Sequence, residues 1–88
     1  MQRVNFNVGE QRHVKLLIHA TDGAPFTIRN AAWELGYGDV TESRGDCEID
    51  DHVVDAFIAP EKRTTYILQF EYEIASEKLI KKIEVAVT

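Results

Sequence analysis

Residues 64–74 read Thr-Thr-Tyr-Ile-Leu-Gln-Phe-Glu-Tyr-Glu-Ile. One parity of this stretch holds Tyr66, Leu68, Phe70, Tyr72 and Ile74, and the other holds Gln69, Glu71 and Glu73, with Ile67 as the apolar exception. Strict alternation places the two sets on opposite faces of a β-strand. The apolar face needs a second layer to cover it, because a lone ribbon cannot bury it. The stretch therefore predicts a strand at the centre of a layered β-protein.

Further segments alternate in the same way, and turn residues separate them. With residues 64–74 they make seven predicted strands, the others being residues 3–8, 13–20, 26–37, 47–50, 53–59 and 79–88. Residues 40–42 are a short candidate edge segment, and turns are expected at 21–25, 36–39 and 43–46, where Gly, Asp, Ser and Pro concentrate. Turn signals about every ten residues without a convincing helix are typical of a β-sandwich. We predict an all-β, seven-stranded sandwich of two antiparallel sheets, formed by residues 1–88 as one domain.

Three local features qualify this prediction. The apolar parity changes near Asn30, which predicts a β-bulge there. Trp33 is the largest apolar side chain and is expected between the two layers. Residues 75–78 are expected to form a hairpin turn before the closing strand, but Ser76 followed by Glu77 and Lys78 could also cap a helical turn over residues 76–82.

The charge of the chain restricts its partners. Fifteen acidic and ten basic residues give a net charge of −5, which argues against nucleic acid as a partner. No apolar run is long enough for a membrane span, and the first residues lack the apolar segment of a secretory signal. Cys47 is the single cysteine, so no intrachain disulfide can form, which agrees with a reducing compartment. A cytoplasmic or virion-associated protein is expected.

The order of the strands and the placement of the aromatic residues resemble immunoglobulin-like and fibronectin-type-III-like domains. Trp33 lies on the third predicted strand, Tyr66 lies where such domains have a tyrosine corner, and Leu68 takes the place of a cysteine. The resemblance covers nearly the whole chain. It implies an apolar contact, from Leu68 to Leu16, Ile18 or a neighbour, in place of the disulfide. The chain is also similar to small accessory proteins of bacteriophage and prophage particles, which implies a structural role.

An acidic cluster is the main candidate for a ligand site. Calcium prefers several hard oxygen ligands, and the sequence offers carboxylates at Asp46, Glu48, Asp50, Asp51 and Asp55. Alternation, however, would turn Glu48 and Asp50 to solvent, and the EF-hand pattern is absent. These acids therefore remain an alternative, with no metal site, cofactor or zinc centre expected.

Other motifs are weak as signs of chemistry. Arg44-Gly45-Asp46 spells an integrin-binding tripeptide and is expected to be an ordinary glycine turn in a loop. The histidines, which are His13, His19 and His52, are expected at the surface. Cys47 and His52 could form a thiolate dyad across a turn, but a sandwich edge offers no pocket for it. No catalytic residues are expected, and the chain is interpreted as a non-enzyme.

The outward face of the closing hairpin is the remaining candidate surface. Gln69, Glu71 and Glu73 are expected beside Lys82 and Glu84, with Ile67, Leu79 and Ile80 adding apolar area. A sandwich without a pocket acts through its faces, edges and loops. The sequence therefore favours a non-catalytic protein–protein interaction or structural module whose partner is itself or another particle subunit. The alternative is a ligand- or calcium-binding module that uses residues 46–55.

Overall fold

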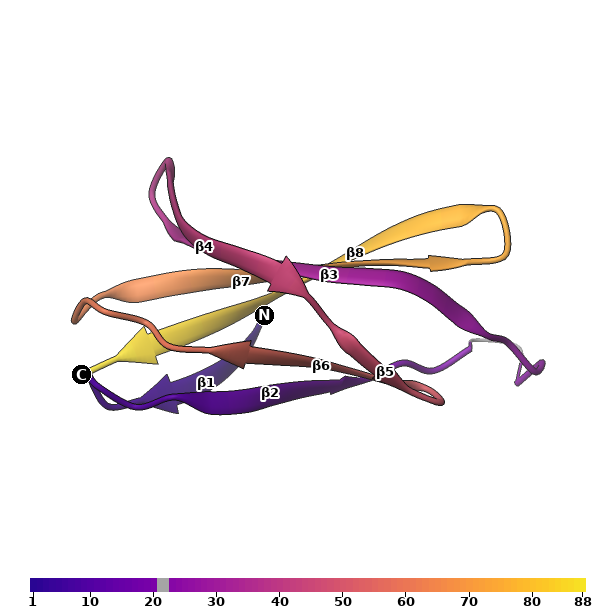
Figure 1. Ribbon diagram of the computed structural model, residues 1–88, viewed down its shortest axis with the longest axis horizontal. Coiled ribbons are helices and arrows are strands. Elements are labelled where there is room, and N and C mark those ends of the chain that lie inside the picture. The colour runs from indigo at the N-terminus through magenta and orange to yellow at the C-terminus, as the bar shows by residue number, and fades with distance from the viewer. Residues whose placement is uncertain (21–22) are drawn as a thin grey trace.

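The computed structural model describes residues 1–20 and 23–88, so Thr21 and Asp22 of the predicted turn at 21–25 lie outside the described residues. Within this part of the chain there are eight strands and no helix (Figure 1). They are β1 (Gln2–Phe6), β2 (Arg12–Leu17), β3 (Ile28–Tyr37), β4 (Val40–Asp46), β5 (Glu48–Asp50), β6 (Val53–Ile58), β7 (Thr65–Ile74) and β8 (Glu77–Val87). No helix long and apolar enough to cross a membrane occurs among the described residues.

The strands form two layers, as predicted. One sheet has five strands in the order β1-β8-β7-β3-β4, and the other has three in the order β2-β6-β5. The expectation that both sheets are antiparallel is wrong for one pair, because β1 runs parallel to β8, with Gln2 beside Ile83 and Phe6 beside Val87. Local alternation marks a strand but carries no information about the direction of a distant neighbour, which explains the error.

The inner face of β7 occupies the centre of the core. Tyr66, Leu68 and Phe70 are fully buried, and Tyr72 is nearly so. Trp33 is half-buried and packs against the same cluster, opposite Phe70 on the neighbouring strand. The other sheet contributes the apolar parity of β2 and β6, which consists of Val14, Leu16, Val54, Ala56 and Ile58. The predicted facing of residues 64–74 is therefore confirmed.

The predicted bulge near Asn30 is also present. The pairing of β3 with β7 shifts between Arg29 and Ala32, and Asn30 has a φ of 52°. Asn tolerates this left-handed conformation better than most residues. The Asn30 side-chain amide also donates a hydrogen bond to Glu73 on β7, at 2.6 Å. The bulge turns the apolar parity of β3 so that Ala31 and Leu35 both reach the core.

The predicted turn at residues 43–46 is wrong, and this raises the count from seven strands to eight. These residues belong to β4, which pairs with β3 from Ala32–Asp46 to Tyr37–Val40. Gly45 was expected in a turn, but packing against a side chain of the neighbouring strand explains why a glycine stands in this strand. A Cβ on Gly45 would lie 3.0 Å from the indole of Trp33. The glycine therefore makes room for the largest side chain of the chain.

Residues 77–82 belong to β8 and form no helical turn. Ile74 on β7 pairs with Glu77 on β8, so Ala75 and Ser76 are the two residues of a tight hairpin turn. Ala75 has a φ of 54°, which a two-residue hairpin requires of its first turn position. The predicted hairpin is confirmed, but its turn has two residues instead of the four expected at 75–78, and β8 begins at Glu77 instead of Leu79.

Candidate functional site

The outer face is the side of the five-stranded sheet that is turned away from the three-stranded sheet. Two rows of directly paired residues cross it. The first row is Lys82, Gln69, Glu34 and Arg44, and the second is Ile80, Glu71, Ala32 and Asp46. Paired residues on neighbouring strands point to the same side of a sheet. The first row therefore brings charged or amide groups from four strands onto one surface, and the second adds the carboxylates of Glu71 and Asp46 from β7 and β4.

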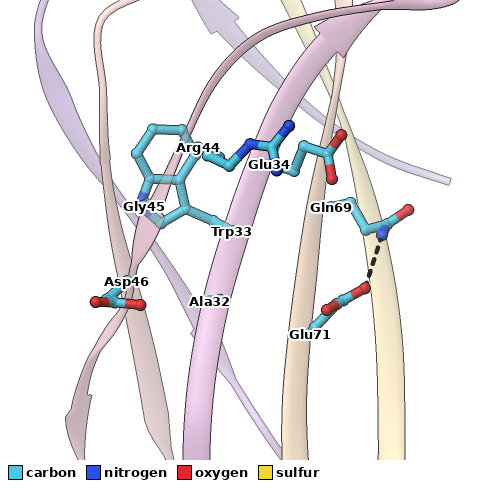
Figure 2. A pocket seen from close by; sticks show the side chains of 8 residues that line it. All are labelled: Ala32, Trp33, Glu34, Arg44, Gly45, Asp46, Gln69 and Glu71. Atoms are coloured by element: carbon cyan, nitrogen blue, oxygen red, sulfur yellow. Dashed lines mark hydrogen bonds between the residues drawn. The ribbon is translucent and has the colours of Figure 1, made fainter.

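A shallow hollow of about 300 Å³ lies on this outer face. Its lining consists of Ala32, Trp33, Glu34, Arg44, Gly45, Asp46, Gln69 and Glu71 (Figure 2). Ala32 contributes only a methyl group, and Figure 2 shows the carboxylates of Asp46 and Glu71 on opposite sides of it. The hollow thus results from a small residue placed between larger polar ones on three adjacent strands.

The side chains around the hollow differ in whether they form hydrogen bonds or ion pairs with their neighbours. Gln69 donates to Glu71 at 3.3 Å, and Thr41 donates to Glu34 at 2.6 Å. The side chains of Arg44 and Asp46, by contrast, make no hydrogen bond or ion pair with any described residue. Arg44 has Glu34 directly across from it on β3, yet Glu34 is bonded to Thr41 instead. The outer face therefore carries a cation and an anion of β4 that form no hydrogen bond or ion pair with a described residue.

The five acids proposed as an alternative calcium site do not all come together, although Glu48 pairs directly with Asp55 and both line a shallow hollow with Asp50. Asp46 lies on the five-stranded sheet, whereas Glu48 and Asp50 lie on β5 of the other sheet, Asp51 lies in the turn after it, and Asp55 lies on β6. Asp55 is hydrogen-bonded to His13 at 3.0 Å. Among residues 1–20 and 23–88, no three His, Cys, Asp or Glu side chains are grouped so that they could hold a metal ion. The arrangement gives no support to the calcium alternative.

The tripeptide Arg44-Gly45-Asp46 was predicted in a loop, and that placement is wrong. All three residues lie in β4, paired with Glu34, Trp33 and Ala32. A strand at a sheet edge holds its backbone extended, so the tripeptide is not displayed on a projecting turn.

One of the three histidines expected at the surface is partly buried. His52 is half-buried, stacks on Phe26 with ring centroids 4.0 Å apart, and has its Nε2 atom 3.2 Å from the Phe26 carbonyl oxygen. His52 is thus partly covered by Phe26, while its side chain stays 36% exposed. His13 is exposed and lies against Phe57, with ring centroids 4.8 Å apart.

The environment of Cys47 opposes a thiolate dyad. Burial, followed by the nearby charges of Asp55 and Asp46, raises the pKa of Cys47 from 9.0 to about 11. A nucleophilic cysteine needs the opposite shift. Cys47 and His52 also lie at opposite ends of β5, and His52 is engaged with Phe26. The two residues do not form a catalytic pair.

The hairpin surface predicted from the sequence is only part of the outer face. Gln69, Glu71, Lys82 and Ile80 take their predicted places, but Leu79 is wrong, because it pairs with inward-facing Tyr72 and packs on the core. Ala32, Glu34 and Arg44 were missed. Their contribution depends on how β3 is registered against β7 and β4, and residues 43–46 carry no apolar alternation that would have marked a strand there.

Comparison with known proteins adds information about the fold. No family model and no curated protein matches the chain. Among solved structures, the chain is similar to an engineered protein crystallised by the Northeast Structural Genomics Consortium, with a TM-score of 0.74 and 18% identity. The match covers 99% of this chain, which spans only 18% of the length of that protein. At this level of identity, the likeness concerns the fold alone.

Proposed function

We propose that this chain is a non-catalytic protein–protein interaction module of immunoglobulin-like architecture that binds through its outer face. One setting for such a module is a bacteriophage or prophage particle, where its partners would be copies of itself or other particle subunits. The observation that carries the proposal is the outer face, a sheet surface that no other described element covers and that carries a hollow lined from three strands.

Two features support the immunoglobulin-like part of the proposal. The Tyr66 hydroxyl accepts a hydrogen bond from the backbone N–H of Lys62, four residues upstream, at 2.9 Å. This is the contact that defines a tyrosine corner in such domains. In addition, Leu68, Leu16 and Ile18 belong to one buried cluster, as expected where an apolar contact replaces the disulfide between the sheets.

The chemistry of the outer face favours a protein partner over a small molecule. The hollow is shallow, and its rim carries three carboxylates, one guanidinium and one amide. Small-molecule sites are concave and mostly apolar, with few polar groups. A mixed polar surface with apolar residues such as Ile80, which is 55% exposed, is closer to the composition of a protein interface.

The test is a binding assay with the products of neighbouring genes, using two variants that each add an arginine to one sheet. Ala32→Arg fills the hollow on the outer face, and Leu17→Arg is the matched control on the three-stranded sheet, where Leu17 is 55% exposed. We expect a partner that wild type and Leu17→Arg retain and that Ala32→Arg loses. Loss with Leu17→Arg alone would place binding on the other sheet and contradict the proposed surface. A chain that binds no such product and also remains monomeric at high concentration would contradict the interaction function itself.

A further inference from the structure

We propose that two copies of this chain associate edge to edge through β4, in an antiparallel register that places Gly45 opposite Gly45 of the second copy. The proposal rests on the interaction function above and deepens it by naming the partner, a second copy, and the segment that binds it. The resulting dimer would have one continuous sheet made from both five-stranded sheets. Four observations on β4 and its surroundings lead to it.

The first observation is that β4 is an edge strand with backbone groups available for pairing. It is the last strand of the five-stranded sheet and is bonded on one side, to β3. The N–H of Cys47 donates to the carbonyl oxygen of Ala31, at 2.9 Å. Because backbone groups alternate in direction along an antiparallel strand, those of Gly45 also point to β3. Those of Arg44 and Asp46 therefore point to the open edge, where another strand could pair with them.

The second observation is that the sequence of this edge is complementary to itself. When two antiparallel copies are centred on Gly45, Arg44 of each copy lies opposite Asp46 of the other. Opposite charges directly across a strand pair are favourable, and like charges are unfavourable. A symmetric dimer requires this kind of self-complementary patch, in which residue i contacts residue j and j contacts i. Each of the two symmetric contacts therefore joins Arg44 of one copy to Asp46 of the other.

The third observation is that neither charge is used within the chain. The side chains of Arg44 and Asp46 make no hydrogen bond or ion pair with any described residue, although Glu34 is directly opposite Arg44. In Figure 2 the Arg44 side chain extends over β3 beside Glu34, and the carboxylate of Asp46 lies well away from it at β4. Pairing with the second copy would satisfy both groups. It would also form four backbone hydrogen bonds from the outward N–H and C=O groups of the same two residues.

The fourth observation concerns Trp33 of β3, whose indole packs against Gly45 of β4. Its indole reaches from β3 across to β4, so that a Cβ on Gly45 would lie 3.0 Å from the ring. The ring is half-buried in the single chain. With Gly45 opposite Gly45, no side chain separates the two indoles at the symmetry axis. The pairing would therefore cover part of both rings, and aromatic residues are enriched at protein interfaces.

The geometry limits how much surface the dimer buries. The extra residue Glu42 interrupts the β3–β4 ladder on one side, and after Cys47 the chain leaves for the other sheet. Pairing is thus confined to residues 43–47 of each copy. Such an interface is smaller than the roughly 1,600 Å² of a standard protein complex, so we expect association that depends on concentration.

The decisive experiment uses charge reversal with mixing. Sedimentation equilibrium over a wide concentration range should give wild type a mass that rises from monomer toward dimer. Arg44→Asp places two like-charged pairs across the axis, and so does Asp46→Arg, so each variant alone should stay monomeric. An equimolar mixture of the two variants should regain the dimer, because both symmetric positions then carry opposite charges. Circular dichroism checks that both variants remain folded.

The alternative outcomes overturn the proposal in distinguishable ways. A wild-type chain that is monomeric throughout rejects the dimer, and the interaction function still stands if an outer-face partner is found with the Ala32→Arg test. A dimer that both single variants retain places the interface elsewhere. If both variants are monomeric and their mixture also stays monomeric, the proposed register is wrong. Quenching or a spectral shift of Trp33 fluorescence that follows the mass of wild type, and is absent in Arg44→Asp, would support the position of the indole.

Discussion

Tyr66 connects three parts of the chain through one hydroxyl group. The hydroxyl accepts from the Lys62 N–H at 2.9 Å and donates to Glu42 on β4 at 2.7 Å. Its ring is fully buried and meets the edge of Tyr37 with centroids 5.3 Å apart. Burial, and next the hydrogen bond to Glu42, raises the pKa of Tyr66 to about 12. The protonated hydroxyl therefore holds the loop before β7 and the bulged residue of β4 in place.

Replacing Tyr66 by Phe should lower the free energy of unfolding by about 1–3 kcal/mol. The change removes one hydrogen bond to a backbone amide and one to a carboxylate, and bonds to charged groups are the stronger kind. Urea unfolding would measure the loss. Tyr72→Phe is the control, since Tyr72 is 8% exposed and its hydroxyl makes no hydrogen bond with a described residue. Equal costs for the two variants would contradict the role assigned to the Tyr66 hydroxyl.

At the scale of the element, the β3–β4 hairpin depends on a close approach of two backbones. A Cβ on Gly36 would lie 2.4 Å from the carbonyl oxygen of Val40, which belongs to the backbone and cannot turn aside. The approach occurs where the ladder shifts between Leu35 and Gly36 to accommodate Glu42 as an extra residue. Gly36 is thus required by packing and not by its own φ angle.

Gly36→Ala should destabilise the fold by about 1–3 kcal/mol, as expected when a side chain is forced into a well-packed region. Thermal or urea unfolding would measure the change. The control is Gly38→Asn in the same hairpin, where φ is 56° and nothing lies within 4 Å of a Cβ. Asn tolerates that conformation, so its cost should be small. A larger cost for Gly38→Asn than for Gly36→Ala would show that turn conformation, and not backbone crowding, governs this hairpin.

The elements also show which parts of the fold the sequence could predict. The alternation in β7 and β6 was sufficient, because both strands have one buried and one wet face. β4 was missed because its local residues, Ser43 to Asp46, are turn formers, and only the indole of Trp33 explains Gly45. Only part of the candidate site could be predicted, because its residues come from several strands. Gln69 and Glu71 follow from parity within one strand, whereas Glu34 and Arg44 reach the site only through the register between strands.

At the scale of the whole molecule, Cys47 lies where the chain passes from one sheet to the other. Burial, and then the charges of Asp55 and Asp46, raises the pKa of this thiol to about 11. The free energy of unfolding therefore depends on pH in the range where the thiol ionises. A thiol in the unfolded chain ionises near pH 9.0, while the folded chain still holds its proton. The folded state thus binds more protons above that pH. Its stability from this group is complete below pH 9.0 and falls as pH rises through about 11.

We therefore expect the free energy of unfolding to decline with pH above 9, and Cys47→Ala to reduce that decline. The measurement is the urea midpoint of both proteins at pH 8, 10 and 11. Ionisation of Tyr66 adds a second decline above pH 10, the ordinary pKa of tyrosine, and Cys47→Ala should leave this part unchanged. Parallel curves for the two proteins from pH 8 to 11 would contradict the raised pKa of the thiol.

The parallel pairing of β1 with β8 has a mechanical consequence. Because the two terminal strands run in the same direction, opposing forces on the first and last residues would slide one strand along the other. The five residue pairs between Gln2–Phe6 and Ile83–Val87 would then share the load at once, instead of separating one after another. The backbone bonds from Val8 to Thr88 and from Thr88 to Phe6 would add to this clamp. We therefore expect the fold to resist tension applied along its two terminal strands.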